Sequence, residues 1–163
     1  MQTQNARYWI DYLQLQPHPE GGYYKEVFRS EMDVVRTSEA GTKQACTSIY
    51  YLLEGGEYSG FHRIGSDEVW YFHKGVPLYL HVISHDGIHT VHELSDRSSG
   101  NLSVVVSAGL WFGAELPSKD GFALVSCAVA PAFDFNEFEM AKKEKLLQQY
   151  PQHTDIIKKL CRE

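Results

Sequence analysis

The sequence predicts an all-β fold, a sandwich or barrel with short helices at both ends of the chain. Short runs rich in β-branched and aromatic residues recur along its middle, separated by turn signals. Helical patterns do not alternate with these runs, which argues against a doubly wound α/β fold. With 163 residues, 43% of them hydrophobic, we expect one domain over 1–163. Its barrel core should span about 22–131 and its helical tail about 135–162.

The expected elements follow in chain order. Asn5 caps a short helix that runs to about Leu13. The prolines and glycines of QPHPEGG then form a turn. Strands are expected at 23–30, 47–53, 68–73, 78–84, 87–93, 102–107 and 122–129.

Two segments are predicted to be something other than strand. The polar stretch 36–44 should be a mobile loop. A helix is expected over 135–150, with Asp134 or Asn136 near its cap. Pro151 ends that helix and starts a second, shorter one that runs to Leu160.

Charge and composition exclude several classes of partner. The net charge is −6 and the basic residues are scattered, so no nucleic-acid footprint is expected. The three cysteines are odd in number and form no CxxC pair, which favours a reduced, cytoplasmic setting. The N-terminus lacks the pattern of a signal peptide, and no apolar run is long enough for a membrane span. The expected partners are a small-molecule ligand and a second copy of the chain.

The stretch 56–75 resembles the first cupin motif, which is Gly, five residues, His-x-His, three or four residues, Glu, six residues, Gly. Here Gly56, His62, Glu68 and Gly75 have matching spacings, and Ile64 replaces the second histidine. Alternation places positions 62 and 64 on one strand face.

A second cupin motif would lie near 107–115, and it also departs from the pattern. Gly109 fits, but Ser107 replaces the usual proline and Phe112 stands where a histidine is expected. In metal cupins three histidines and the glutamate hold a divalent metal. Two remaining ligands are too few for a tight site, so we expect neither a metal nor another cofactor. A substitute ligand such as His73 or His81 stays open, although parity places His73 on the face opposite Glu68.

A narrower resemblance covers nearly the whole chain. It rests on HPEGGYYKEVFRSE (18–31), FHRIGSDEVWYFHKG (61–75), CAVAPAFDFNEFEM (127–140) and the YPQHTDIIKKL tail. These segments resemble Cupin_5 (DUF985), a family of the RmlC-like cupin superfamily. The resemblance implies a double-stranded β-helix jelly-roll barrel, often a homodimer, related in fold to sugar-nucleotide epimerases.

His62 and Glu68 are the candidate catalytic residues. The epimerases place their histidine base at a position similar to that of His62, and an imidazole can take a proton alpha to a carbonyl. Glu68 could orient His62 or bind a substrate hydroxyl. The simpler interpretation is a buried pair of these two residues, or a salt bridge from Glu68 to Arg63 or Arg29.

The remaining candidates would bind the ligand. HPEGG is either only a tight turn or also places His18 and Glu20 at the barrel mouth. One phenol of the neighbouring Tyr50 and Tyr51 should point inward, and Tyr50 is the candidate. The other candidates are the anion-binding Arg29 and Arg63 and the aromatic Trp70, Phe72 and Phe112, which could equally fill the core. Which face of strand 23–30 points inward stays open.

Three functions are compatible with these residues. The first is a metal-independent epimerase or isomerase that acts on a carbohydrate-like or sugar-nucleotide ligand. The second is a non-catalytic small-molecule-binding protein. The third, a metal-dependent enzyme, is disfavoured by Ile64 and Phe112.

Overall fold

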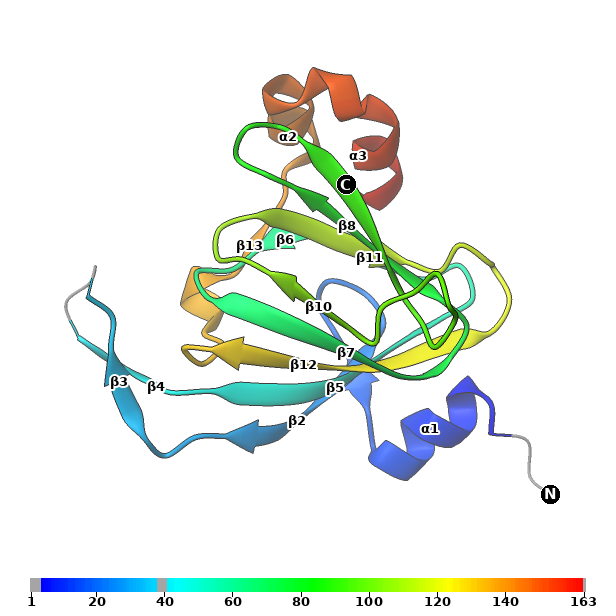
Figure 1. Cartoon of the computed structure of the whole chain (residues 1–163), viewed down its shortest axis with the longest axis horizontal. Helices are drawn as coiled ribbons and strands as arrows, with labels where there is room; N and C mark the ends of the chain where they lie inside the picture. The colour runs from blue at the N-terminus through cyan, green and yellow to red at the C-terminus, as the bar shows by residue number, and fades with distance from the viewer. Residues whose placement is uncertain (1–3, 38–40, 163) are drawn as a thin grey trace.

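The computed structural model describes residues 4–37 and 41–162, and it confirms the expected all-β jelly roll. Two antiparallel sheets face each other, with helices outside them (Figure 1). The first sheet has the spatial order β1 (Gln16–Pro17), β2 (Tyr23–Arg29), β5 (Thr47–Glu54), β12 (Phe122–Ala130), β7 (Asp67–Gly75) and β10 (Ser103–Val106). The second has the order β13 (Glu139–Met140), β6 (Tyr58–Arg63), β11 (Trp111–Glu115), β8 (Leu78–Ile83) and β9 (His89–Leu94).

The main core lies between the two sheets, and β7 illustrates how alternation builds it. Glu68, Trp70 and Phe72 are buried on the inner face, whereas Tyr71 and His73 are exposed on the other. The inner face meets apolar side chains of the second sheet, among them Leu80 and Phe112. Burial of these faces supplies the main stabilisation of the barrel.

Among the described residues, three α-helices cover the outer faces of the sheets (Figure 1). The first, α1 (Ala6–Leu13), packs Ile10 into a cluster with Leu52 and Leu124 of the first sheet. Asn5 caps it as predicted, since its side chain accepts the Tyr8 backbone N–H at 3.0 Å. The helices α2 (Lys143–Gln149) and α3 (Thr154–Leu160) pack on the second sheet. In the part of the chain that is described, no helix combines the length and apolarity that crossing a membrane requires.

The prediction of a loop over 36–44 is wrong for 42–44, which form a strand, whereas residues 36, 37 and 41 lie outside helices and strands. β3 (Asp33–Val35) and β4 (Thr42–Gln44) form an antiparallel hairpin that projects from the barrel (Figure 1). Residues 38–40 lie outside the described residues. The strand β4 was missed because its three residues are all polar, and so short a segment gives no periodicity.

The prediction of one helix over 135–150 is also wrong in its first half. A 3-10 turn, η1 (Phe135–Glu137), is followed by the extended β13, and the helix begins only at Lys143. Asp134 caps the turn through its side chain, and β13 pairs with β6 at the edge of the second sheet. Pairing with β6 thus overrides the local helical preference. The second helix was predicted correctly: η2 (Pro151–His153) leads into α3, which ends at Leu160.

Candidate functional site

A cavity of about 750 Å³ opens into the barrel beside β2. Its buried wall contains two histidines and two glutamates, His18, Glu20, His62 and Glu68, although His18 is less completely buried than the others. Its outer wall contains charged, amide and aromatic side chains from β2, β4 and the segment 133–138. The cavity therefore combines a buried acid–base cluster with a polar and aromatic mouth.

The HPEGG turn positions two members of the cluster. The Gly21 N–H donates to the His18 carbonyl at 3.0 Å, and the His18 N–H donates to the Gly22 carbonyl at 2.9 Å. Gly21 and Gly22 have φ of +114° and +71°, and a Cβ at Gly21 would collide with the Tyr58 carbonyl oxygen. The HPEGG segment is therefore a tight turn that also places His18 and Glu20 in the cavity wall.

Glu20 and His62 form the central contact of the site. Nε2 of His62 lies 3.0 Å from Oε2 of Glu20, and its Nδ1 lies 2.7 Å from the Gly60 carbonyl oxygen. A carbonyl oxygen only accepts, so Nδ1 carries a proton and Nε2 of the neutral ring is an acceptor. One proton therefore joins Glu20 and His62, carried either by the carboxyl group or by the imidazole.

Burial sets the protonation of this cluster. It lowers the pKa of His62 to about 4, which the hydrogen bond to Gly60 partly offsets. It raises the pKa of Glu20, against the opposing influence of His18. Burial, and secondarily the charge of Glu20, raises the pKa of Glu68 to about 8, which the neighbouring Cys127 thiol partly offsets. At pH 7 Glu68 is therefore mostly a neutral acid that can donate a hydrogen bond.

His18 extends the cluster on the other side of Glu20. Its Nδ1 accepts the Glu20 backbone N–H at 3.2 Å and lies 3.7 Å from Glu20 Oε2. Burial lowers the pKa of His18, with Glu20 opposing the shift. The neutral ring therefore carries its proton on Nε2, while the Tyr24 ring packs edge-on at a centroid distance of 4.4 Å.

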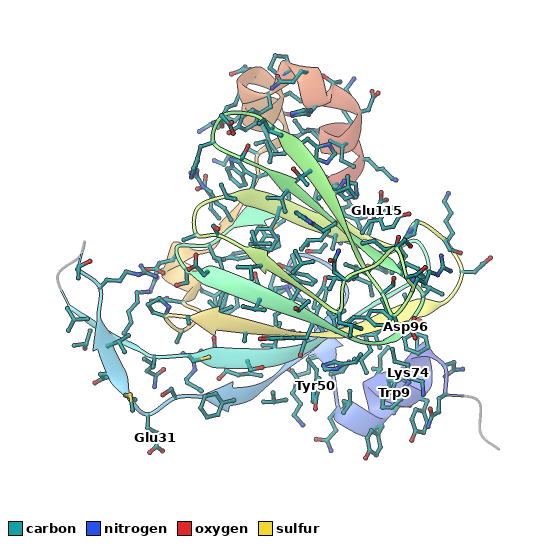
Figure 2. All side chains as sticks on the ribbon, viewed as in Figure 1. Trp9, Glu31, Tyr50, Lys74, Asp96 and Glu115 are labelled. Atoms are coloured by element: carbon teal, nitrogen blue, oxygen red, sulfur yellow. The ribbon has the colours of Figure 1, made fainter. Side chains whose placement is uncertain are left out.

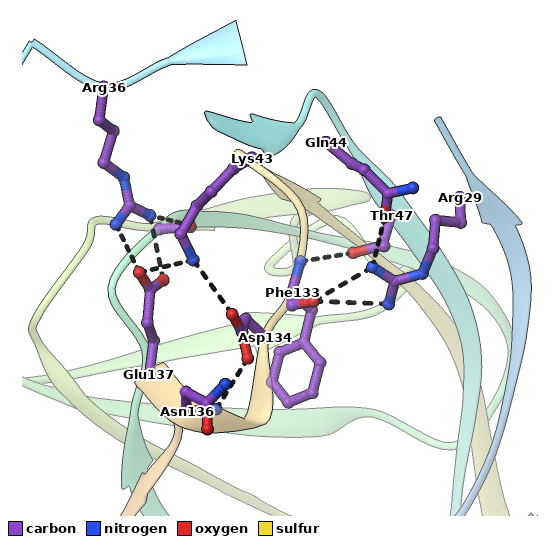
Figure 3. Close-up of polar contacts among 10 residues, drawn as sticks. Arg29, Arg36, Lys43, Gln44, Thr47, Phe133, Asp134, Asn136 and Glu137 are labelled. Atoms are coloured by element: carbon purple, nitrogen blue, oxygen red, sulfur yellow. Dashed lines mark hydrogen bonds and ion pairs between the residues drawn. The ribbon is translucent and has the colours of Figure 1, made fainter. Parts of the chain in front are cut away.

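Most charged groups at the mouth are already paired (Figure 3). Arg29 donates to both carboxylate oxygens of Glu26 at 2.9 and 2.8 Å. It also donates to the Gln44 amide oxygen at 2.9 Å, and it contacts the Phe133 carbonyl oxygen. Lys43 pairs with Glu137 at 2.6 Å and lies 3.6 Å from Asp134. These contacts join β2 and β4 to the segment 133–138.

Five of the ten residues predicted for the site line the cavity, namely His18, Glu20, Arg29, His62 and Glu68. His62 pairs with Glu20 rather than with Glu68, the partner that the simpler interpretation expected.

The other five predicted residues lie outside the cavity wall. Trp70, Phe72 and Phe112 belong to the core between the sheets, and Phe112 packs on the His62 ring at a centroid distance of 4.1 Å. Arg63 pairs with Glu139 at 2.6 Å and covers the Trp111 ring.

Tyr50 and Tyr51 point to opposite faces of β5. Tyr50 packs with the α1 cluster, and Figure 2 shows it on that side of the sheet. The inward phenol is that of Tyr51, which is fully buried and donates to the Gly21 carbonyl at 2.6 Å. Alternation along the strand predicts that one of the two phenols points inward, but which one depends on the sheet that faces this strand. The choice of Tyr50 was therefore wrong.

Sequence reasoning missed a large part of the mouth. The missed side chains that line it include Gln14, Gln16, Tyr24, Lys25, Phe133, Phe135 and Phe138. Phe135 and Phe138 were assigned to a helix and Phe133 lies just before it, although the density of phenylalanines in a short stretch after the last long strand was an available signal. Lys25 and Glu26 both line the cavity from β2. The register of β2 against β5 shifts between Glu26 and Phe28, so simple alternation did not predict which side chains of this strand face the cavity.

The residues do not fit the metal site of metal-binding cupins. Ile64 lines the cavity where the second histidine of the motif would lie, and Phe112 replaces the later one. Across residues 4–37 and 41–162, no group of three or more histidine, cysteine, aspartate or glutamate side chains has an arrangement that could hold a metal. The chemistry of the cavity is therefore considered below from the side chains alone.

A double-sheet jelly roll whose cavity contains the histidine and glutamate of the first motif defines a cupin. The family model Cupin_5, described as "Cupin superfamily (DUF985)", matches residues 7–141, and the chain belongs to this family.

Three similar proteins have no named activity, and the two of them with solved structures have the same fold. The chain is 32% identical to the uncharacterized protein YML079W of Saccharomyces cerevisiae over 154 residues, which cover 85% of this chain and 76% of the yeast protein. A hypothetical protein from Leishmania major is 37% identical with a TM-score of 0.91, covering 98% of this chain and 99% of that one. Protein SO0799 from Shewanella oneidensis is 41% identical with a TM-score of 0.89 and the same coverage.

A more distant likeness concerns the fold alone. Oxalate decarboxylase from Bacillus subtilis is 15% identical with a TM-score of 0.55, and the match covers 88% of this chain but 36% of that one.

Proposed function

We propose that the cavity binds a small carbohydrate-like carbonyl compound and that the protein moves a proton at the carbon next to the carbonyl, as a metal-independent isomerase or epimerase. The observation that carries the proposal is the 3.0 Å contact between His62 Nε2 and Glu20 Oε2 inside a ligand-sized cavity. Such a pair shares one proton and can both take and return it.

In the proposed reaction His62 is the base, and the carboxyl group of Glu20 keeps the shared proton and turns away from Nε2 when the substrate binds. Nε2 takes the proton from the substrate carbon, and the Nδ1–H bond to the Gly60 carbonyl stabilises the imidazolium that forms. Electrons from the broken C–H bond form the enolate, whose oxygen accepts a hydrogen bond or proton from neutral Glu68. Return of a proton to the opposite face of the same carbon inverts it, and return to the neighbouring carbon moves the carbonyl.

The polar lining supports a ligand with several hydroxyl groups. Hydroxyl and amide side chains of Thr42, Gln44 and Thr47 line the cavity together with Gln16. These groups both donate and accept hydrogen bonds, as sugar hydroxyls require. The phenylalanines of the mouth add flat apolar surface on which a ring can pack.

The proposal is tested by proton exchange in deuterated water. The protein is incubated with a panel of keto sugars, their phosphates and keto-sugar nucleotides, and loss of the α-proton is followed by proton NMR. We expect exchange for at least one compound, its loss in His62→Ala and its retention in His73→Ala, an exposed histidine of β7 outside the cavity wall. Exchange at the wild-type rate in His62→Ala would contradict the role of His62.

A second candidate function, non-catalytic binding, is favoured by one specific observation. Both ring nitrogens of His62 already have partners, Glu20 and the Gly60 carbonyl, as in a satisfied buried pair. This function predicts that a compound of the panel raises the melting temperature while no compound loses its α-proton.

The resemblance to the family also leads us to propose a homodimer in a cytoplasmic setting. Val27 and Phe28 on β2 and Val35 on β3 are about half exposed or more, at 48%, 53% and 68%. Apolar side chains at the edge of a sheet are typical of a surface that pairs with another chain. Light scattering on the purified protein would give twice the 18.6 kDa mass of the chain if the proposal holds, and the monomer mass would contradict it.

A further inference from the structure

We propose that Lys25, together with Gln14 and Gln16, forms a subsite at the cavity mouth for an anionic group of the ligand, a phosphate or a carboxylate. The inference rests on the proposed function only in taking the cavity as the ligand site. It assigns a specificity-determining role to Lys25, a residue that the sequence patterns did not single out.

The ion pairs of the cavity wall distinguish Lys25 from the other cations. Arg29, Lys43 and Lys25 line the cavity. Glu26 neutralises Arg29, and Glu137 and Asp134 neutralise Lys43. Lys25 Nζ donates instead to the neutral Gln14 Oε1 at 3.1 Å, and no carboxylate within residues 4–37 and 41–162 pairs with it. Lys25 thus keeps an uncompensated positive charge at the mouth.

The backbone of Gln14 supports a role beyond packing. Gln14 follows α1 with φ 56° and ψ 47°, and it is the sole non-glycine residue with positive φ in the described part of the chain. Glycine is favoured at such a position, and another residue costs on the order of 1 kcal/mol. A glycine would lack the amide that holds the Lys25 ammonium group, so the side chain gives a reason for the less favourable backbone.

The three side chains together match an oxyanion. The ammonium group of Lys25 has three donors, of which Gln14 uses one. Gln16 lines the cavity from the neighbouring strand β1, on the face of its partner Tyr24, and offers a second amide on the inner side of the mouth. The resulting set of two amides and one ammonium group presents donors and a positive charge without an opposing carboxylate.

The rest of the cavity gives the ligand a direction. The carboxyl groups of Glu20 and Glu68 lie in the buried wall, where burial raises their pKa and would oppose a second negative charge. An anionic ligand is therefore expected to place its charged group at Lys25 and its neutral carbonyl part beside His62. This orientation would let the protein discriminate phosphorylated or carboxylated compounds from neutral ones.

The subsite is tested with inorganic phosphate and with acetate by calorimetric titration. We expect phosphate to bind the wild-type protein, to bind Lys25→Gln about tenfold or more weakly, and to bind Lys25→Arg nearly as well as wild type. Lys145→Gln is the matched control, because Lys145 is an exposed lysine of α2 outside the cavity. Tighter binding of acetate than of phosphate would assign the subsite to a carboxylate.

Gln14→Gly separates a binding role from a structural one. It should leave the protein as stable as wild type or more stable, because glycine suits the left-handed backbone, yet it should weaken phosphate binding. Unchanged anion affinity in Lys25→Gln, or no binding of either anion to the wild-type protein, would overturn the subsite.

These results are independent of the proposed reaction. Lys25→Gln should slow exchange of the phosphorylated form of a keto sugar more than exchange of its neutral form, because only the phosphorylated form carries the charge that Lys25 binds. It should lose its preference for the phosphorylated form of that sugar. Absence of exchange in the wild-type protein, together with phosphate binding that Lys25→Gln weakens, would contradict the proposed function and leave the subsite standing.

Discussion

Glu20 of the HPEGG turn and His62 of β6 meet at 3.0 Å, and Gly60 fixes both of them. The Gly60 N–H donates to the Glu20 carbonyl at 2.9 Å, and the Gly60 carbonyl accepts from His62 Nδ1 at 2.7 Å. One backbone unit thus sets the position of the turn and the tautomer of the imidazole. The contact therefore depends on a local turn, a strand and their packing together.

Replacing Glu20 by glutamine tests whether the shared proton matters for catalysis. Glu20→Gln keeps the size of the side chain and can donate its amide N–H to His62 Nε2, but it cannot exchange a proton. We expect α-proton exchange to fall by about 100-fold or more with little change in melting temperature. Glu57→Gln, an exposed carboxylate outside the cavity, is the control and should leave exchange unchanged. Wild-type exchange in Glu20→Gln would show that Glu20 only positions the turn.

Replacing Glu68 by glutamine tests the buried neutral acid. The pKa of Glu68 is about 8 in the folded protein against an ordinary value of 4.5. The folded state therefore holds more protons than the unfolded state between these values, so stability falls as pH rises from about 4.5 through 8. Glu68→Gln cannot ionise and should lose this alkaline decline.

The measurement for Glu68→Gln is urea unfolding at pH 6 and pH 9. Wild type should lose stability between the two values by on the order of a few kcal/mol, and Glu68→Gln should lose clearly less. Asp67→Asn is the matched control, because Asp67 is the exposed residue directly before Glu68. This variant should lose stability between pH 6 and pH 9 as the wild type does. Parallel pH profiles for wild type and Glu68→Gln would show that Glu68 is ionised in the folded protein.

Local patterns predicted the barrel and the histidine of the site, but they missed its most important contact. The spacing from Gly56 to Gly75 sets one strand, one turn and the inner face of the next strand, so His62 and Glu68 could be placed in the cavity. The pairing of His62 with Glu20 joins segments far apart in the chain, and no local period encodes such a contact. The same limit applies to Tyr51, whose inward position depends on which sheet covers β5.

The mouth was harder to predict because tertiary pairing overrides local preference there. The residues 135–150 have helical composition, yet Met140 pairs with His62 on the sheet edge and Phe138 lies against the His62 ring at a centroid distance of 5.4 Å. Lys25 lies on β2 beyond the two residues that pair with β1 and close to a register shift, where alternation does not decide which side chains reach the cavity.

Replacing Gly21 by alanine tests the requirement of the HPEGG turn for glycine. Gly21 has φ of +114°, and an added Cβ would collide with the Tyr58 carbonyl oxygen and with the Arg162 guanidinium group. We expect Gly21→Ala to lower the free energy of unfolding by about 2 kcal/mol or more and to reduce exchange by displacing Glu20. Gly56→Ala is the control, because a Cβ there would meet no atom within 4 Å. Equal stability of the two variants in urea would contradict the account of the turn.

Replacing Phe135 by alanine tests whether the aromatic mouth binds the ligand. Phe135 lines the cavity but is 56% exposed, and its ring packs on Phe133 at a centroid distance of 4.8 Å. The apolar Phe135 ring takes no part in the proton transfer at the Glu20–His62 pair. Its loss should therefore weaken the binding of the ground state and of the transition state equally. We therefore expect KM for the exchanging compound to rise about three- to tenfold with kcat unchanged. Tyr71→Ala, an aromatic side chain 42% exposed on β7 and outside the cavity, should change neither constant. A fall in kcat at unchanged KM would instead place Phe135 in the chemical step, and no change in either constant would show that the ligand does not reach the mouth.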